Sequence, residues 1–424
     1  MKSSMCRLYG AGDLRLETVD VPPAGEDGIL VSIVTDSLCM SDHKTLLQGA
    51  AHTRVPDDIA SNPIVVGHEV CATVLEVGPM WKDKFVIGQK IGMQPCLNEP
   101  GHEMDTVGYS FTTVGGYSTV SRVPRRVLDA GCVLPYAGDD YFKCSLAEPL
   151  SCIVSAFRTT YHTGVNSHKI ELGPKTGGSM LLIASCGAMG MAAIDCALHY
   201  PESRPSRVVV TDIDESRIAH AREVFSGDMI PEGVKIDFIN TAELADPVAK
   251  LKELNGGKGY DDILLFASVK SLVTQCSELL GMGGCLNFFS GPMDKAFGAE
   301  FNFYNIHYKG HHVVGSSGGS AEDTADAIDW IGRGYLHPEV MVTHIGGLNA
   351  AIDTCTNLPK LSGGKKMLYT HKNLPLTAIE DFAKLGKADA FWRDLAKICA
   401  RHRNLWSKEA EDYLLAHAPE LESR

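Results

Sequence analysis

The stretch Leu182-Ile183-Ala184-Ser185-Cys186-Gly187-Ala188-Met189-Gly190 lies between a run of apolar residues and a helix-like segment. It matches the G-x-G-x-x-G fingerprint of dinucleotide-binding turns, except that Ser185 replaces the first glycine. Gly187 lets the backbone approach a pyrophosphate, and Gly190 allows the helix to pack closely on the strand. The free N–H groups at the start of the helix attract the anion. We therefore predict that the cofactor contacts Ser185, Gly187, Ala188, Met189 and Gly190.

An acidic residue ends the next predicted strand. Val208–Thr211 is a short β-branched run followed by Asp212, 22 residues beyond Gly190. A carboxylate at this place hydrogen-bonds the ribose 2′-hydroxyl of NAD and repels the 2′-phosphate of NADP, so NAD(H) is favoured. Asp214 can cap the helix that follows, and Arg217 in that helix is a further candidate cofactor contact.

The chain changes character near residue 150. Before it, strand-like runs such as Ile29–Val34 and Val70–Val77 indicate a compact β-rich domain. After it, strands alternate with helices, which predicts βαβ units, a parallel sheet and an α/β fold. The expected division is a β-rich domain, a dinucleotide-binding domain, a return to the first domain and a helical C-terminal extension: 1–150, 151–315, 316–370 and 371–424.

Composition excludes several classes of protein. The chain has 424 residues, and 39 basic against 52 acidic residues give a net charge of −13. This balance argues against a binder of nucleic acid or of anionic membranes, because both need a basic face. We find no apolar run of 18 residues and no signal-like start, so we expect no membrane span. Thirteen scattered cysteines indicate reduced thiols, and we expect a cytoplasmic protein.

Three short motifs carry residues that can bind a metal. They are Leu38–His43 with Cys39, Pro63–Glu69 with His68 and Glu69, and Leu146–Leu150 with Glu148. A thiolate, an imidazole and a carboxylate suit a catalytic Zn²⁺, which takes three protein ligands and keeps one open position. Each motif is weak alone. Their combination, followed by a dinucleotide-binding turn, is a strong signal.

With these motifs in this order, residues 5–370 resemble the zinc-dependent medium-chain dehydrogenase/reductase family. Gly115-Gly116-Tyr117-Ser118 is similar to the family's Gly-Gly-aromatic motif, and Glu148-Pro149-Leu150 is similar to its polyol (sorbitol-type) branch. The resemblance implies a GroES-like catalytic domain with an inserted Rossmann domain. It also implies hydride transfer between NAD(P)(H) and a secondary alcohol or ketone.

The resemblance also implies roles for single residues. Cys39 and His68 would ligate the zinc, and the third ligand would be Glu69 or Glu148, between which the branch differs. Asp42 would hold the imidazole of His68 in place, and Ser41 would belong to the proton relay.

One departure concerns a second metal. Many family members hold a structural zinc in a lobe with four cysteines, but residues 92–114 contain only Cys96. One thiolate cannot form a Cys₄ site, so we expect one catalytic zinc and no structural zinc.

The loop after the first motif is more basic than the acidic chain around it. Lys44, His52 and Arg54 could bind a substrate phosphate, although an ordinary solvated loop explains them equally well. Together with the C-terminal tail, this loop resembles the L-sorbose 1-phosphate reductase subgroup of bacterial ketose reductases. The resemblance implies a ketose 1-phosphate and a hexitol phosphate as substrate pair, and it leaves NADP(H) open. The alternatives are a free polyol (sorbitol-type) or threonine-type dehydrogenase and, less favoured, a non-enzymatic dinucleotide-binding protein.

The last 54 residues predict helices. Thr377 and Glu380 have the spacing of a capping box, and an apolar stripe recurs at helical spacing from Phe391 to Cys399. We interpret this tail as packed on the body of the protein. From the family resemblance we expect a homodimer or homotetramer.

Overall fold

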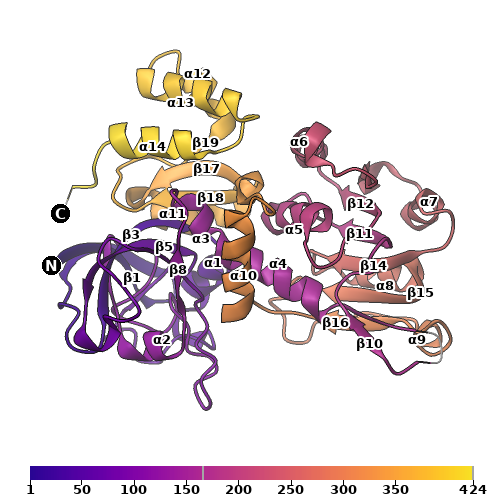
Figure 1. The fold of residues 1–424 in the computed structure, drawn as a ribbon, viewed down its shortest axis with the longest axis horizontal. Coiled ribbons are helices and arrows are strands. Elements are labelled where there is room, and N and C mark those ends of the chain that lie inside the picture. The colour runs from indigo at the N-terminus through magenta and orange to yellow at the C-terminus, as the bar shows by residue number, and fades with distance from the viewer. Residues whose placement is uncertain (165–166, 423–424) are drawn as a thin grey trace. The chain divides into compact units, whose positions relative to one another are not determined.

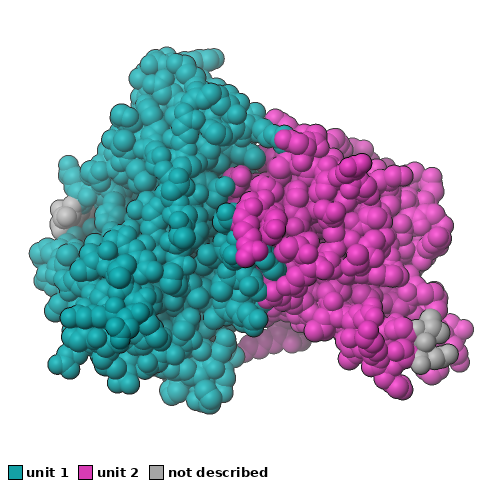
Figure 2. All heavy atoms as spheres, viewed as in Figure 1, with its two compact units in different colours: residues 1–148, 320–332, 342–424 teal, residues 149–319, 333–341 magenta. Residues whose placement is uncertain are grey.

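The computed structural model describes residues 1–164 and 167–422 of the chain. The chain forms two compact units, which Figure 2 distinguishes by colour. The chain begins in unit 1 and then builds most of unit 2. It returns to unit 1 at Ser320, although the short segment Arg333–Met341 again belongs to unit 2. Unit 1 comprises Met1–Glu148, Ser320–Gly332 and Val342–Arg424, and unit 2 comprises Pro149–Gly319 and Arg333–Met341.

Unit 2 is built on a six-stranded parallel sheet. Its strand order, β13-β12-β11-β14-β15-β16, is the 3-2-1-4-5-6 order of doubly wound dinucleotide-binding folds. Every residue of β11 is buried, as expected of a parallel strand that helices cover on both faces. The strands are β11 Ser179–Ile183, β12 Arg207–Asp212, β13 Lys235–Asn240, β14 Tyr260–Leu265, β15 Leu280–Phe288 and β16 His312–Gly315, with a separate hairpin of β9 Tyr161–Thr163 and β10 Ile170–Leu172.

Short polar side chains cap three helices of unit 2, namely α6, α7 and α9. Asp214 accepts a hydrogen bond from the backbone N–H of Arg217 at 3.1 Å, which confirms the predicted cap. Asp246 caps the next helix, whose first residue is a proline. The helices are α4 Ala147–Thr159, α5 Ala188–His199, α6 Glu215–Val224, α7 Pro247–Leu254, α8 Lys270–Leu279 and α9 Phe303–Lys309, with a 3₁₀ turn η5 at Pro338–Met341.

Unit 1 is rich in β-structure and contains two sheets. The larger has the order β19-β17-β18-β3-β5-β6-β8, with β7 also paired to β3, and the smaller has the order β2-β1-β4. The larger sheet is antiparallel except for the parallel pair β17–β18, and its strands β3 and β5 contribute buried residues to an apolar core. The strands are β1 Lys2–Gly10, β2 Asp13–Asp20, β3 Ile29–Ser37, β4 Ile64–Val65, β5 Val70–Val77, β6 Lys90–Met93, β7 Val120–Val123, β8 Val133–Tyr136, β17 Val342–Gly347, β18 Lys365–Tyr369 and β19 Thr377–Ala378.

Helices of unit 1 lie at its sheet ends and in the C-terminal extension. Figure 1 shows α12, α13 and α14 grouped beside β17 and β19. No helix in the described part of the chain has the length and apolar character that a membrane span requires. The helices are α1 Met40–Gln48, α2 Arg125–Asp129, α3 Phe142–Ser145, α10 Ala321–Gly332, α11 Ala351–Asn357, α12 Phe382–Leu385, α13 Ala390–Arg401 and α14 Lys408–His417.

The predicted strands at Ile29–Val34, Val70–Val77 and Val208–Thr211 are confirmed as β3, β5 and β12. The apolar stripe is confirmed in α13, with Trp392 as an additional buried member. The capping box at Thr377 is wrong. Thr377 lies in β19, pairs with Ile345 of β17, and donates its hydroxyl proton to the carbonyl of Pro375.

One buried carboxyl group anchors the C-terminal extension to the rest of unit 1. Glu411 of α14 is fully buried and accepts hydrogen bonds from the backbone N–H groups of Tyr141 and Phe142, at 2.7 and 2.9 Å. The hydroxyl of Tyr369 donates to the same carboxyl group at 2.9 Å, and Trp406 donates to Tyr369. Glu411 therefore satisfies the free N–H groups at the start of α3 from a distant part of the sequence.

Burial raises the pKa of Glu411 to about 7, although the N–H groups of Tyr141 and Phe142 oppose the shift. Its contribution to stability is therefore complete below pH 4.5 and is lost as the pH rises through 7. We expect the free energy of unfolding to fall by on the order of 3 kcal/mol across this range relative to Glu411→Gln. Urea unfolding of both proteins at several pH values measures the difference.

Glu380→Gln is the matched control, because Glu380 is exposed in the same extension. Its profile should follow that of the unmodified protein. Parallel profiles for the unmodified protein and Glu411→Gln would contradict the prediction.

Candidate metal centre and cofactor turn

Three of the predicted metal ligands lie together in unit 1. Cys39 follows β3 and precedes α1, while His68 and Glu69 directly precede β5. The antiparallel pairing of β3 with β5 brings the two motifs to one end of the sheet. One ligand atom each from Cys39, His68 and Glu69 lies within 4.8 Å of the other two. The sulfur, nitrogen and oxygen donors fit a Zn²⁺ ion, which prefers this set in tetrahedral geometry.

Asp42 fixes the orientation of His68. Its Oδ1 lies 2.9 Å from Nδ1 of His68, which leaves Nε2 as the ligand atom. Its Oδ2 accepts hydrogen bonds from the backbone N–H of Cys39 at 2.9 Å and from the hydroxyl of Tyr117 at 3.0 Å. One buried carboxylate therefore positions the imidazole and the start of the helix that carries the thiol.

Glu69 is held by two buried partners. Its Oε1 pairs with the ammonium group of Lys365 and its Oε2 accepts from the hydroxyl of Ser37. Burial raises the pKa of Glu69, and the Lys365 ammonium opposes this shift. Burial also raises the pKa of Cys39, but Lys365 and His68 outweigh burial and lower it to about 7. The cluster therefore favours the thiolate, the form of cysteine that binds metal.

Glu148 lies near the cluster but outside the group of three. It is the second residue of α4 and is buried. Burial raises its pKa, while the charges of His68, Lys365 and Arg54 lower it. These influences place Glu148 within electrostatic range of both the metal ligands and the basic loop.

The predicted phosphate residues lie next to the metal cluster, connected to it through Tyr109. The ring of His52 stacks on that of Tyr109 with centroids 5.6 Å apart, and the guanidinium of Arg54 lies 5.5 Å from the same ring. The Tyr109 ring also lies 5.2 Å from the ring of His68, measured between centroids. Burial lowers the pKa of His52, and the charges of Arg54 and Lys44 lower it further. Lys44, His52 and Arg54 therefore share one electrostatic environment.

Ser41 also contacts this aromatic ring. It forms a side-chain hydrogen bond with Tyr109, and it directly precedes Asp42 on the first turn of α1. Ser41 therefore contacts the ring that also lies against His68 and the basic loop.

The glycine-containing turn lies in unit 2 at the carboxyl end of β11, the first strand of the parallel sheet. This is where doubly wound folds bind ligands, because strand order reverses there. The positive φ of 56° falls on Ala184, one residue before Ser185. The Ser185 hydroxyl donates to the carbonyl of Leu182 at 3.0 Å, so the side chain that replaces glycine is turned back into the strand.

Gly190 and Gly187 have different physical roles. A Cβ atom at Gly190 would overlap with the backbone of Ser185, so glycine is required for α5 to approach the turn. Gly187 precedes the first turn of α5, formed by Ala188 and Met189, and a Cβ there would meet no atom within 4 Å. The space beside Gly187 is therefore open to a ligand at the helix N-terminus.

Asp212 is buried and binds backbone N–H groups with both oxygens. Oδ2 accepts from Cys186 at 3.0 Å, and Oδ1 accepts from Ile213 at 2.8 Å and Asp214 at 3.2 Å. The carboxylate thus ties the turn to the end of β12. Arg217 is half-exposed on α6, with its guanidinium 3.7 Å from Asp214.

Comparison with known proteins agrees with this geometry. Residues 25–130 match the model of the alcohol dehydrogenase GroES-like domain, and residues 188–333 match that of the zinc-binding dehydrogenases. An L-sorbose 1-phosphate reductase from Klebsiella pneumoniae is 43% identical over 415 residues, which are 98% of each chain. A mannitol-1-phosphate 5-dehydrogenase from Aliivibrio fischeri is 43% identical over 410 residues, which are 96% of each chain.

The chain belongs to the zinc-dependent medium-chain dehydrogenase/reductase family. It is an oxidoreductase of the alcohol and polyol dehydrogenase type, and the predicted fold of a GroES-like domain with a Rossmann domain is confirmed. The solved 2R,3R-butanediol dehydrogenase from Bacillus subtilis shares this fold. It has a TM-score of 0.71 at 19% identity and covers 87% of this chain and 99% of its own.

In this dehydrogenase an ion-pair bridge holds the loop that contains Cys96. Arg126 of α2 pairs with Glu99 at 2.5 Å and with Asp105 at 2.6 Å. Cys96 lies in the same loop, and its carbonyl accepts a weak hydrogen bond from the thiol of Cys132. The bridge joins two points of the loop to the body of unit 1, so the loop is held by side chains of opposite charge.

Sequence reasoning missed three residues of the metal cluster's surroundings. Lys365 and Ser37 bind Glu69, and Tyr109 connects the cluster to the basic loop. Lys365 lies 296 residues from Glu69, so no local pattern could reveal their contact. The available signal was the pair of lysines, Lys365 and Lys366, at the start of the short strand β18.

Asp36 also went unnoticed. Its carboxyl group is fully buried, neither oxygen has a hydrogen-bond partner among the described residues, and it contacts Gly116 of the Gly-Gly-aromatic motif. Burial raises the pKa of Asp36 well above its usual range, which favours the neutral acid. Gly116 is therefore required to make room for this side chain.

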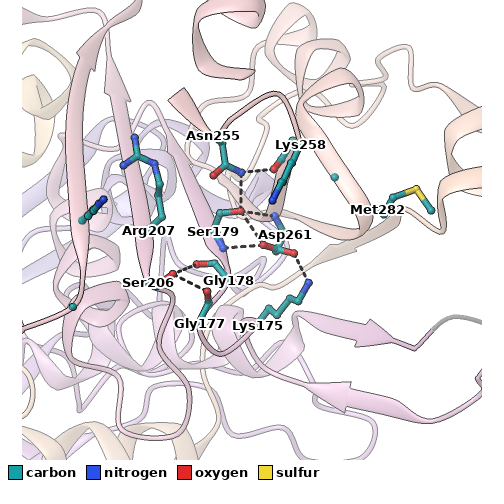
Figure 3. A pocket seen from close by; sticks show the side chains of 14 residues that line it. Lys175, Gly177, Gly178, Ser179, Ser206, Arg207, Asn255, Lys258, Asp261 and Met282 are labelled. Atoms are coloured by element: carbon teal, nitrogen blue, oxygen red, sulfur yellow. Dashed lines mark hydrogen bonds and ion pairs between the residues drawn. The ribbon is translucent and has the colours of Figure 1, made fainter. Parts of the chain in front are cut away.

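A cavity of about 800 Å³ in unit 2 lies at the amino ends of the parallel strands, whereas the cofactor turn lies at their carboxyl ends. Figure 3 shows Lys175 directed at Asp261, which also accepts from Ser179, with Arg207 and Lys258 around the same cavity. The carboxyl ends of the helices point to the same end of the sheet. Basic residues there complement the negative ends of the helix dipoles. This accounts for the basic lining without a ligand.

The two glycines of the turn give a matched test. Gly190→Ala should lower the free energy of unfolding by about 1–3 kcal/mol, because the added methyl group overlaps with the backbone of Ser185. Gly187→Ala should leave that free energy unchanged but weaken NAD(P)H binding about tenfold or more, because its methyl group takes the space of the pyrophosphate. Urea unfolding and NADH fluorescence titration measure the two effects. Equal loss of stability in both variants would disprove this assignment.

Proposed function

We propose that this dehydrogenase catalyses the reversible reduction of a ketose 1-phosphate to a hexitol phosphate with NAD(P)H. The observation that carries the proposal is the aromatic connection between the metal cluster and the basic loop. The ring of Tyr109 lies against His68 of the metal cluster and also against His52 and Arg54 of the basic loop. A substrate whose oxygen lies at the metal would place a phosphate group within reach of the Arg54 guanidinium, a cation that suits phosphate, and of the His52 imidazole beside it.

The names of the relatives support this substrate class. One relative is named for reduction of L-sorbose 1-phosphate and the other for oxidation of mannitol 1-phosphate, and each spans nearly the whole chain. Both names describe a hexose derivative with a phosphate at carbon 1. The shared chemistry is interconversion of a ketone and a secondary alcohol in a phosphorylated six-carbon substrate, although the second name places the reacting carbon at position 5, away from the phosphate at carbon 1.

We infer that Cys39, His68 and Glu69 ligate the single catalytic zinc. Their donor atoms lie within 4.8 Å of one another in a buried environment, which supports Glu69 over Glu148 as the third ligand. When bound, zinc acts as a Lewis acid that polarises the substrate oxygen. Asp42 keeps His68 oriented, and Lys365 balances the charge of Glu69. Glu148, which feels the charges of His68 and Lys365, would hold a water or a substrate hydroxyl.

Ser41 then moves the proton. Its hydroxyl lies against Tyr109, so it can exchange a proton between the substrate oxygen and the solvent side of the basic loop. Burial raises the pKa of Tyr109, so this phenol stays neutral and serves as a hydrogen-bond donor and a rigid support for His52.

For the cofactor we propose NAD(H), with NADP(H) as the competing choice. Ser185, Gly187, Ala188, Met189 and Gly190 form the turn at the start of α5, and Asp212 ends the next strand. Asp212 carries a negative charge against a 2′-phosphate, which supports NAD(H). Arg217 on α6 is the nearby cation that could accept a 2′-phosphate instead.

We also infer a homodimer or homotetramer. β16 is an edge strand of the parallel sheet in the described chain, and Val313 within it is 49% exposed. An exposed edge with an apolar residue supports strand pairing between two copies. For the domains we keep the division 1–150, 151–315, 316–370 and 371–424 as a proposal.

The test is an assay of the zinc-loaded enzyme with NADH and NADPH against L-sorbose 1-phosphate, fructose phosphates and the free ketoses. We expect a preference for a 1-phosphoketose. Activity on free sugars alone would make the protein a sorbitol-type dehydrogenase.

Removing one cation of the loop isolates the phosphate contribution. Arg54→Ala should raise KM for the phosphorylated ketose about 10- to 100-fold, because a charge-assisted hydrogen bond of about 1.5–3 kcal/mol is lost. KM for a free ketose should change little. The control is Arg15→Ala, which also removes an arginine over a tyrosine ring, at Tyr9, but in β2. An equal rise of KM for both substrates would remove the phosphate assignment.

The two glutamates differ in their expected effect on zinc. Loss of a residue that hydrogen-bonds to a metal ligand usually weakens metal affinity about 10–100-fold. Glu69→Gln should weaken zinc retention by more than this, because it changes a ligand itself. Glu148→Gln should retain zinc with lower activity. Zinc content after dialysis against a chelator measures both variants, and the reverse order would make Glu148 the ligand.

A further inference from the structure

A second group of metal-binding side chains lies entirely within unit 2. Asp195 and His199 are four residues apart on α5, so they share one face of the helix. His337 directly precedes η5 and belongs to the segment Arg333–Met341 of unit 2. Nδ1 of His199 and Nδ1 of His337 each lie 2.9 Å from Oδ1 of Asp195. One ligand atom from each residue lies within 4.8 Å of the other two.

Asp195 is already oriented as a metal ligand would be. Its Oδ2 accepts a hydrogen bond from the backbone N–H of His337 at 2.7 Å, which leaves Oδ1 facing both imidazoles. Burial raises the pKa of Asp195, but the hydrogen bonds from His199 and His337 outweigh burial and lower it. The group is therefore a carboxylate with no exposed surface.

Both imidazoles reach the solvent. The side chain of His199 is 15% exposed and that of His337 is 26% exposed, while that of Asp195 is fully buried. An ion could therefore enter from the solvent side and meet the buried carboxylate. Two imidazoles and one carboxylate carry one negative charge and suit zinc and similar divalent ions.

We propose that Asp195, His199 and His337 bind a divalent transition-metal ion, with Zn²⁺ as the reference ion, at a site separate from the catalytic cluster. Ligands about 2.0–2.1 Å from a tetrahedral zinc stand about 3.3 Å apart, so spacings of 2.9 Å need only a small expansion. In the neutral imidazoles the Nδ1 proton moves to Nε2, so that Nδ1 can coordinate the ion. A water completes the fourth position.

The ion would be a second metal beside the single zinc that the sequence motifs predict, and it would be bound without cysteine. It would also have a structural consequence. Arg333–Met341 belongs to unit 2, although the residues on both sides of this segment belong to unit 1. α5, which carries two of the ligands, begins at the cofactor turn. The ion would therefore tie this segment to the helix that presents the turn.

The same chain offers a matched comparison. His162 and the buried Asp262 form a similar pair in unit 2, with Nε2 of His162 2.9 Å from Oδ1 of Asp262. Nδ1 of His162 contacts the carbonyl of Gly283 at 3.1 Å, and no third ligand joins this pair among the described residues. His162→Gln thus removes a half-buried histidine beside a buried aspartate without touching the proposed site.

The experiment is a zinc titration of the full-length, metal-free protein at micromolar concentration, with bound zinc measured by equilibrium dialysis and elemental analysis. The variant Cys39→Ser lacks the thiol ligand of the catalytic cluster, so zinc at that cluster does not add to the zinc counted per chain. We expect one zinc per chain in Cys39→Ser, one in Cys39→Ser with His162→Gln, and none in Cys39→Ser with His337→Gln. Zinc should also raise the unfolding temperature of the first two proteins and not that of the third.

A second variant guards against misfolding. Cys39→Ser with His199→Gln should also bind no zinc, and circular dichroism and NADH binding show whether unit 2 of each variant is folded. If Cys39→Ser binds no zinc, or if folded His337→Gln and His199→Gln proteins bind as much zinc as the control, the three residues form only a hydrogen-bonded contact and the proposal is overturned. Neither outcome depends on the substrate of the enzyme.

Discussion

The buried ion pair between Glu69 and Lys365 joins the beginning and the end of the chain in unit 1. Glu69 directly precedes β5, and Lys365 opens β18, which pairs with β3 only after the chain has built unit 2. A buried ion is costly without its partner, and losing one partner of such a pair typically costs about 3–5 kcal/mol. The metal cluster therefore depends on the return of the chain to its first sheet.

Buried carboxylates recur as the groups that hold functional segments in place. Asp42 orients His68 and the start of α1, Asp212 binds the N–H groups around the cofactor turn, and Glu411 attaches the C-terminal extension to α3. In each case the carboxylate accepts donors from distant parts of the chain, including backbone N–H groups. These groups would be unsatisfied in the interior without it.

Charged side chains hold two further segments of the enzyme in place. Arg126 bridges Glu99 and Asp105 and so holds the loop that contains Cys96. Asp195 fastens the segment that carries His337 to α5 with either two hydrogen bonds or, as proposed, a metal ion. In both segments one charged side chain with several partners holds the backbone in place.

The sequence by itself determined the parallel sheet, the turn with Gly187 and Gly190, the acidic residue that ends β12 and the order of the three metal motifs, because each depends on local spacing or periodicity. It also brought Cys39, His68 and Glu69 into one hypothesis, although it left Glu69 and Glu148 equal. Only the tertiary structure placed Glu69 with Cys39 and His68, set Tyr109 between His68 and Arg54, and moved Thr377 from a helix cap into a strand. The physical reason is that ion pairs, ring stacking and strand pairing join residues through space, and residues tens to hundreds of positions apart leave no periodic signal in the sequence.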